Sequence, residues 1–322
     1  MKVGCFSVLF GDKDLEEAIR TIKKLCPGIS TIELGTGNYP GNSHCDPKKL
    51  LNNSETFDNF KNILEEEEME ISALSCHGNP IHPNEEIAEK HLETHRNTIK
   101  LASKLGVETV VGFSGCPGAS PEAKVPSWNI IAWPPDYLDS LKWQWDEVLI
   151  PFWQKEEKFA ADHNVKIAFE PHPGFCVYNT ETMLKLRENT GDNIGCNFDP
   201  SHFFWQNMDP LKMVRALKDC IFHVHAKDCK IDPSNVALNG CNDAKPYGDE
   251  INRSWIFRTV GYGHSEKWWK DFVSELKLIN YDGVLSIEHE DSLMAMEEGL
   301  QKSYSLLDDV IVKKNPGEMF WA

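Results

Sequence analysis

Several apolar segments in the second half of the chain end in side chains that bind metals or transfer protons. One of them, VKIAFEPHPG at 165–174, places Glu170 and His172 directly after an apolar run. In a β-strand, residues two apart lie on the same face, so these two side chains point the same way. Burying a carboxylate there is costly unless a metal ion or a charged partner compensates it. The segment therefore indicates one part of a larger site.

Three later segments carry side chains of the same kinds. GCNFDPSH, IFHVHAKD and VLSIEHED supply, in chain order, Asp199 and His202, then His225 and Lys227, then Glu288 and Glu290. One residue from each segment joins Glu170 in a set of three carboxylates and one imidazole: Glu170, Asp199, His225 and Glu288. Without a cation, clustered carboxylates would repel one another. We therefore predict a divalent-metal site, whose oxygen-rich ligands suit Mn²⁺, the expected ion, or Mg²⁺ or Co²⁺ better than a structural zinc.

The elements that must position these residues follow a regular alternation. Eight short apolar runs predict strands at 2–9, 31–35, 71–76, 109–113, 165–170, 194–198, 221–226 and 284–288. Amphipathic stretches between them predict helices at 14–26, 55–69, 85–105, 141–163, 181–188, 210–218, 266–279 and 293–312. Strict βα alternation favours a parallel sheet, and eight units fit a single (β/α)8 TIM barrel over 1–312, followed by a tail at 313–322.

A doubly wound sheet is the competing α/β architecture. It would be expected to carry a Gly-rich phosphate-binding turn after its first strand. Neither GxGxxG nor GxxxxGK[ST] occurs in the chain. The sequence therefore favours the barrel and predicts no nucleotide cofactor.

Two long stretches interrupt the alternation, at 114–140 and 228–264. The first is rich in Gly, Pro and Trp, which predicts a long loop, and the second contains RTVGYGH at 258–264. TIM-barrel enzymes place their active sites at the carboxyl ends of the strands, where both stretches begin. Glu33 and His77 also fall at the ends of earlier predicted strands.

Composition excludes several classes of partner. The chain has 50 acidic and 33 basic residues and a formal charge of −17, which repels nucleic acids and anionic membrane surfaces. No apolar run approaches the roughly 18 residues of a membrane helix, and the N-terminus lacks a signal-peptide pattern. The ten cysteines form no CxxC pair, which is typical of reduced thiols. We expect a cytoplasmic protein.

These motifs resemble those of the xylose-isomerase-like TIM-barrel superfamily, the sugar isomerase/epimerase family that also contains endonuclease IV. Its Glu, Asp, His and Glu on strands five to eight are matched by Glu170, Asp199, His225 and Glu288. Its Asp-x-x-His is matched by Asp199 and His202, and its His-x-His-x-Lys-Asp by His223 to Asp228. The resemblance covers nearly the whole chain.

One position departs from the pattern of the ketose 3-epimerases in this family. Those enzymes use a second glutamate shortly after the metal-binding glutamate of strand five. Here the corresponding offset reaches Cys176, and the next polar group after Glu170 is His172. Similar Glu-x-His strand ends occur in relatives that process 3-oxo-glycosides, including metal-dependent epimerases and the α subunits of C-glycoside-deglycosylating enzymes.

The chemistry predicted from these groups is proton abstraction next to a carbonyl, with a divalent cation stabilising an enediolate. His172 is the candidate base, and Glu170 and Glu288 complete the catalytic set. The alternative role of His172 is to orient Glu170. Substrate contacts are predicted for His202, His77, Lys227 and Arg258, the last from its place in the family. Lys227 could instead neutralise the carboxylates, and His202 could be a helix cap.

The predicted function is that of a metal-dependent sugar isomerase or epimerase acting on a keto-sugar or 3-oxo-glycoside. The alternative is a lyase that cleaves 3-oxo-glycosides by β-elimination, including C-glycoside deglycosylation as the α subunit of a two-subunit enzyme. More distant alternatives are an endonuclease IV-like nuclease, which the negative charge opposes, and a non-catalytic carbohydrate-binding barrel. We expect a small carbohydrate substrate, a homo-oligomer and, for deglycosylation, a small second subunit, with no nucleic acid or membrane partner.

Overall fold

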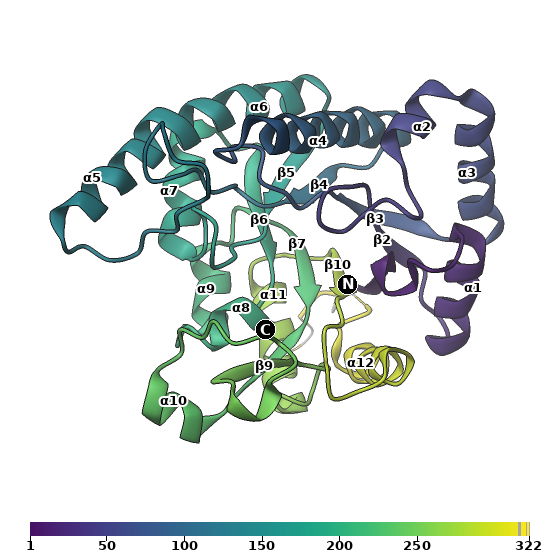
Figure 1. The fold of residues 1–322 in the computed structure, drawn as a ribbon. Helices are drawn as coiled ribbons and strands as arrows, with labels where there is room; N and C mark the ends of the chain where they lie inside the picture. Colours follow the sequence, from purple (N-terminus) through teal and green to yellow (C-terminus); the bar gives the residue numbers. More distant parts are fainter. Residues whose placement is uncertain (315–316, 320, 322) are drawn as a thin grey trace.

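Eight apolar segments form the strands of a closed parallel barrel in the computed structural model, which describes residues 1–314, 317–319 and 321 (Figure 1). Around the barrel the strand order is β1-β10-β7-β6-β5-β4-β3-β2. The strands are β1 (Lys2–Phe6), β2 (Thr31–Gly35), β3 (Glu70–Ser75), β4 (Thr109–Gly112), β5 (Lys166–Phe169), β6 (Ile194–Phe198), β7 (Ile221–Ala226) and β10 (Val284–Ile287). The predicted (β/α)8 TIM barrel is confirmed.

Helices cover the outside of the barrel and connect each strand to the next (Figure 1). The principal ones are α1 (Leu15–Leu25), α3 (Ser54–Glu66), α4 (Glu85–Leu105), α6 (Ile150–Asp162), α7 (Thr180–Thr190), α9 (Pro210–Ala216), α11 (Glu266–Leu278) and α12 (Met296–Val310). Local signals set their ends. In α4 the Asn84 side chain accepts hydrogen bonds from two backbone N–H groups of the first turn, and Gly106 ends the helix at φ 73°. These signals explain why the predicted bounds of 85–105 are correct.

Several smaller elements were not predicted. β1 is shorter than 2–9 because Ser7–Phe10 form a 3₁₀ helix, η1. The short helices α2 (Pro47–Asn52) and α8 (Ser201–Phe204) lie in stretches expected to be loops. The second long stretch contains an antiparallel pair, β8 (Asp228–Ile231) and β9 (Trp255–Arg258), together with α10 (Pro233–Asn239) and the 3₁₀ helix η3 (Glu250–Asn252).

The first long loop is shorter than the predicted 114–140. Helix α5 (Pro135–Trp143) begins there and continues through a π-helical segment, η2 (Gln144–Leu149), into α6, so the predicted helix start at 141 is wrong. Proline at the first helical turn needs no N–H partner, which allows the helix to begin at Pro135. No residue of α5 is buried, and in Figure 1 the helix extends away from the barrel at the left.

The barrel interior is polar at the end where the functional residues were predicted. Most of the inward-facing residues there come from β2, β6 and β7, and five of them are at most 2% exposed: Glu33, Asn197, Asp199, His223 and His225. Small apolar side chains, Ala73, Val111 and Ala168, pack together from β3, β4 and β5. Among the described residues no helix is long and apolar enough to cross a membrane. In the predicted tail, Met319 and Trp321 expose most of their side chains, whereas 315–316, 320 and 322 lie outside the described residues.

Candidate active site

The four predicted metal ligands converge at the carboxyl ends of β5, β6, β7 and β10. One ligand atom from each of Glu170, Asp199, His225 and Glu288 lies within 4.8 Å of the other three. His225 Nδ1 is 3.0 Å from Glu170 Oε2 and 3.2 Å from Glu288 Oε2. Three of the four residues directly follow a strand, whereas His225 lies inside β7. The parallel barrel therefore brings together four residues that span 119 positions of sequence, 170 to 288.

The side chains present fit a divalent cation. Asp199 Oδ2, His225 Nδ1 and Glu288 Oε2 are buried, and each lacks a hydrogen-bond partner among the described residues. Their neighbouring charged groups lie 2.7 to 3.2 Å away, but these contacts do not have hydrogen-bond geometry. Buried polar atoms are almost always paired in native proteins. Three convergent ligand atoms without a hydrogen-bond partner therefore point to a cation, which carboxylates and an imidazole would hold.

Lys227 offsets part of the negative charge. Its Nζ lies 2.7 Å from Glu288 Oε2, 3.2 Å from Asp199 Oδ2 and 3.1 Å from Glu290 Oε2. Burial alone would raise the pKa of the Glu288 carboxyl, but Lys227 and His225 outweigh burial and lower the pKa to about 2. The structure thus places Lys227 among the ligands themselves. It can both neutralise charge, which was the alternative interpretation, and reach toward Glu290, which is 49% exposed.

His172 is oriented as a proton acceptor. Its Nδ1 lies 2.6 Å from the carbonyl oxygen of Pro173, and a carbonyl can only accept, so Nδ1 carries the proton. Nε2 is then left with its lone pair. The ring lies 4.1 Å from the ring of His202 and 4.9 Å from that of Phe113, measured between centroids. Burial is the main reason why the pKa of His172 falls to about 3, so the imidazole is neutral near pH 7.

His202 and His77, both predicted to contact substrate, lie against the metal ligands. His202 Nε2 is 3.0 Å from Glu170 Oε1 and 3.2 Å from Asp199 Oδ2. His77 Nε2 is 3.2 Å from Glu170 Oε2. The two imidazoles therefore hold the Glu170 carboxylate from both of its oxygens, and both residues are nearly fully buried.

Arg258 is not brought to this cluster. It lies on β9, and its Nε donates a hydrogen bond to Asp291 Oδ2 at 3.0 Å. Within the part of the chain that the structure describes, no hydrogen bond or ion pair joins it to the four predicted ligands. The adjoining residues 259–264 are held in turn by Asp228, which accepts from the backbone N–H groups of Gly261, Gly263 and His264.

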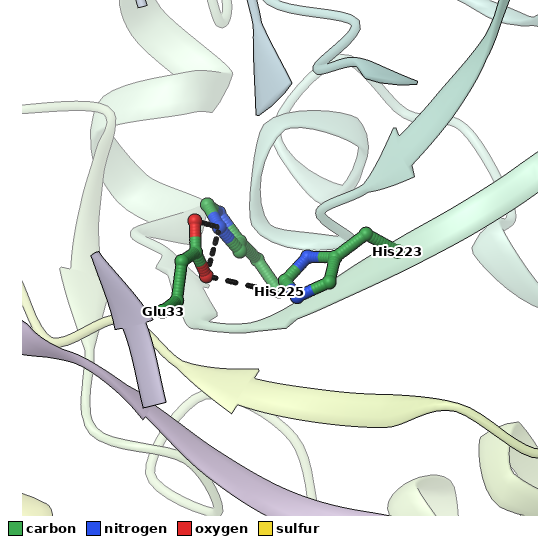
Figure 2. Close-up of side chains that lie close together, drawn as sticks. All are labelled: Glu33, His223 and His225. Atoms are coloured by element: carbon green, nitrogen blue, oxygen red, sulfur yellow. Dashed lines mark hydrogen bonds and ion pairs between the residues drawn. The ribbon is translucent and has the colours of Figure 1, made fainter. Parts of the chain in front are cut away.

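Sequence reasoning missed one residue of the site, Asn197. Its Nδ2 donates to Glu170 Oε2 at 3.0 Å, and its Oδ1 lies 2.9 Å from His223 Nδ1. The residue lies two positions before Asp199 on β6, so the period of a strand places both on one face. That spacing could have identified it. A second cluster, Glu33 with His223 and His225, lies deeper in the barrel (Figure 2).

The aromatic residues of the first long loop are divided between interior and surface. Trp128 packs edge-on against Tyr178 at 5.2 Å between ring centroids. Both line a cavity of about 240 Å³ together with Cys116 and Cys176. Trp133 is 75% exposed and does not line that cavity. Of the two tryptophans that the sequence places in this loop, Trp128 is the one that lines this cavity.

Comparison with known proteins agrees with this geometry. The chain is 38% identical over 314 residues, 97% of this chain and 99% of the relative, to the uncharacterized protein YfiH of Bacillus subtilis. An inosose dehydratase of Clostridium tetani is 28% identical over 134 residues, 41% of this chain and 43% of that protein. The structure of 3-keto-D-glucoside 4-epimerase from E. coli shares the fold, with a TM-score of 0.61, 16% identity and coverage of 96% of this chain and 99% of that chain.

The family assignment rests on the length of the match. Residues 19–310 match the sequence model of the family described as xylose isomerase-like TIM barrel. A D-tagatose 3-epimerase-like protein is also similar in structure, with a TM-score of 0.61, 21% identity and coverage of 96% and 97% of the two chains. This chain belongs to the xylose isomerase-like TIM barrel family.

Proposed function

We propose that this protein is a divalent-metal-dependent enzyme that removes a proton next to the carbonyl of a keto-sugar or 3-oxo-glycoside, and so isomerises or epimerises it. The observation that carries the proposal is the set of three buried, convergent ligand atoms that have no hydrogen-bond partner among the described residues, Asp199 Oδ2, His225 Nδ1 and Glu288 Oε2. The family contains sugar-modifying enzymes, and the proteins similar to this chain include epimerases and dehydratases, which supports the proposal.

Different residues would bind the metal ion and transfer the proton in such a reaction. A divalent cation held by Glu170, Asp199, His225 and Glu288, with Mn²⁺ as the expected ion, would supply Lewis acidity toward the substrate carbonyl. His172 Nε2 takes the proton from the adjacent carbon, because its Nδ1–H is already committed to the Pro173 carbonyl. For isomerisation, His172 returns the proton to the neighbouring carbon, whereas epimerisation requires a second proton donor on the opposite face of the same carbon.

The side chains around His172 support its role as the base. Phe113 and Phe175 lie 4.9 and 5.6 Å from its ring centroid and reduce the access of water to it. Such shielding limits competing reactions with bulk water, while the proton on the imidazole can still exchange with solvent before it returns.

A second candidate is β-elimination, which uses the same first step. It is favoured by the position of Lys227, whose ammonium lies 3.1 Å from the half-exposed Glu290 carboxylate and 2.7 Å from Glu288. In this reaction His172 takes the C–H proton, a carbon–carbon double bond forms, and a proton from Lys227 leaves with the departing hydroxyl as water. The inosose dehydratases among the relatives are named for a loss of water.

The test is solvent isotope exchange. The metal-depleted protein, reloaded with Mn²⁺, is incubated in D2O with ketoses, 3-oxo-glucosides and an inosose. Deuterium on the carbon next to the carbonyl, in a product of otherwise unchanged composition, is the result expected for an isomerase or epimerase. Loss of water identifies the elimination. No exchange with any of these compounds in the presence of Mn²⁺, Mg²⁺ or Co²⁺ would contradict the proposal.

The chain offers a matched pair of histidines as a control. His163, like His172, has Nδ1 close to a backbone carbonyl, at 2.7 Å from Phe159 O, but it lies just before β5, at the opposite end of the barrel. We expect His172→Gln to lower the rate of exchange by about 10² to 10⁴ and His163→Gln to leave it unchanged. Metal binding by both variants should match that of the wild type.

A further inference from the structure

Glu33 is fully buried and lies beside Nε2 of the predicted ligand His225, whose Nδ1 faces Glu170 and Glu288; Figure 2 shows Glu33 with His225 and His223. Both of its carboxylate oxygens lie close to His225 Nε2, at 2.9 and 3.0 Å. Its Oε1 also accepts a hydrogen bond from the Ser75 hydroxyl. The side chain is fully buried, and no lysine or arginine forms an ion pair with it among the described residues.

The direction of the contact between Glu33 and His225 follows from its chemistry. A carboxylate can only accept hydrogen bonds, so His225 Nε2 must be the donor. A neutral imidazole has one N–H, so Nδ1 then has a lone pair. Nδ1 is the atom that faces Glu170 and Glu288, and it makes no hydrogen bond.

We propose that Glu33 is a positioning residue that keeps the proton of His225 on Nε2, so that Nδ1 is the nitrogen offered to a divalent cation. The inference rests on the proposed metal-dependent function. Metal-binding histidines commonly donate their other ring N–H to a carboxylate, which fixes the tautomer and raises the basicity of the ligand. Without Glu33 the tautomer with a proton on Nδ1 would become accessible, and that proton would occupy the place of the ligand lone pair.

The neighbouring histidine, His223, donates no hydrogen bond to Glu33, so His225 is the imidazole that donates to this carboxylate. Asn197 donates to Glu170 through Nδ2, so its Oδ1 faces His223 Nδ1 and must accept a hydrogen bond from the Nδ1–H group. A neutral His223 therefore has no proton on Nε2, which lies 3.8 Å from Glu33 Oε2 and 3.4 Å from Ser72 Oγ. His223 thus does not compete for Glu33. A second cation between Glu33, His223 and His225 would require removal of the Nε2 proton of His225.

The backbone is irregular at the two residues that this network uses. The register between β2 and β3 shifts between Ile32 and Glu33, and the register between β6 and β7 shifts between Cys196 and Asn197. Such bulges change the direction of a side chain and are frequent near active sites. Both shifts coincide with the side chains that hold His225 and Glu170 in place, which is independent support for a positioning role.

The experiment measures metal binding, not turnover. Mn²⁺ affinity is determined by calorimetry for the wild type, Glu33→Gln, Glu33→Ala and the control Ser72→Ala, which alters a neighbour of His223 but not His225. We expect the two Glu33 variants to bind Mn²⁺ about 10- to 100-fold more weakly and Ser72→Ala to match the wild type. ¹⁵N NMR of the Zn²⁺-loaded wild type should show the proton of His225 on Nε2. This spectrum needs no variant, so it remains informative even if a Glu33 variant does not fold.

The possible failures are distinguishable. Equal Mn²⁺ affinity of the wild type and the folded Glu33 variants would overturn the positioning role alone, as would a spectrum that places the proton on Nδ1. Lack of metal binding by the wild type would overturn the proposed function together with this inference.

Discussion

Two groups of buried carboxylates lie at the same end of the barrel, and the protein satisfies them in different ways. In the loop beside the site, Asp228 Oδ2 accepts three backbone N–H groups at 2.9 to 3.0 Å, and Oδ1 accepts from Cys229 N and His264 Nδ1. Asp291 Oδ2 accepts from Thr259 N, Thr259 Oγ1 and Arg258 Nε. In the candidate site, Asp199 Oδ2 and Glu288 Oε2 have no hydrogen-bond donor among the described residues.

The difference separates a structural from a functional use of the same side chain. Asp228 and Asp291 replace their lost hydration with donors from the loop at 258–264, so they stabilise that loop and have little capacity left for a ligand. The donors that they use also include the N–H groups of Gly261 and Gly263, which are therefore not available to a substrate phosphate. Asp199 and Glu288 instead face the Lys227 ammonium, and each keeps an oxygen without a hydrogen-bond partner.

The largest effect is expected for loss of a proposed ligand. Glu288→Gln should weaken Mn²⁺ binding by at least about 100-fold, since even residues that only support metal ligands contribute 10- to 100-fold. The free energy of unfolding of the metal-free protein should fall, because the change removes the carboxylate that pairs with the buried Lys227 ammonium. Titration calorimetry and urea denaturation measure the two quantities. Unchanged Mn²⁺ affinity would place Glu288 with the structural carboxylates.

The opposite outcome is expected for the loop. Asp228→Asn replaces an acceptor of five hydrogen bonds by an amide with one oxygen, so we expect the free energy of unfolding to fall by about 3 kcal/mol. Mn²⁺ affinity of the folded variant should remain within about threefold. Asp291→Asn serves as a second case from the same loop. If either variant lost metal binding without losing stability, the division between the two groups would be wrong.

His95 is a buried histidine whose Nε2 has no hydrogen-bond partner among the described residues. Its protonation therefore offers a test that depends on pH. Burial is the main reason why its pKa is lowered to about 4. Glu156 raises the pKa and Arg96 lowers it, both by smaller amounts. The pKa of this histidine is about 6.5 in the unfolded state, higher than in the folded state. Its contribution to the free energy of unfolding is therefore complete above pH 6.5 and is lost as the pH falls toward 4. Between pH 7 and pH 5 this histidine should account for a loss of about 2 kcal/mol in the free energy of unfolding.

Urea denaturation at the two pH values measures this loss. His95→Gln should show a correspondingly flatter pH dependence than the wild type. An equally steep dependence in His95→Gln would show that other groups cause the acid sensitivity.

The smallest effect concerns Arg258, which belongs to the loop in the structure but was predicted to bind substrate. Arg258→Lys keeps the positive charge but loses the Nε hydrogen bond to Asp291, so we expect a loss of about 1 kcal/mol in the free energy of unfolding. Mn²⁺ affinity and KM should not change. A tenfold rise in KM with unchanged stability would restore the predicted substrate contact.

Local patterns in the sequence determined the strands, most helices and the four proposed ligands. The predicted bounds of β2, β6, β7 and α4 agree with the structure, because alternating apolar runs and capping residues act over a few neighbouring positions. Glu170, Asp199 and Glu288 could be identified because each directly follows such a run, and parallel strands bring their carboxyl ends to one side.

Only the tertiary structure decided how these residues are supported. The contact between Glu33 and His225 joins positions 192 residues apart, across a lumen that exists only once β1 pairs with β10. The register shifts at Glu33 and Asn197, which re-aim both side chains, have no signature in the apolar pattern. The same is true of the β8–β9 pair and of the donors around Asp228. A periodic pattern specifies which face of a strand is buried, but which buried side chains meet depends on barrel closure and on the register of strands far apart in the chain.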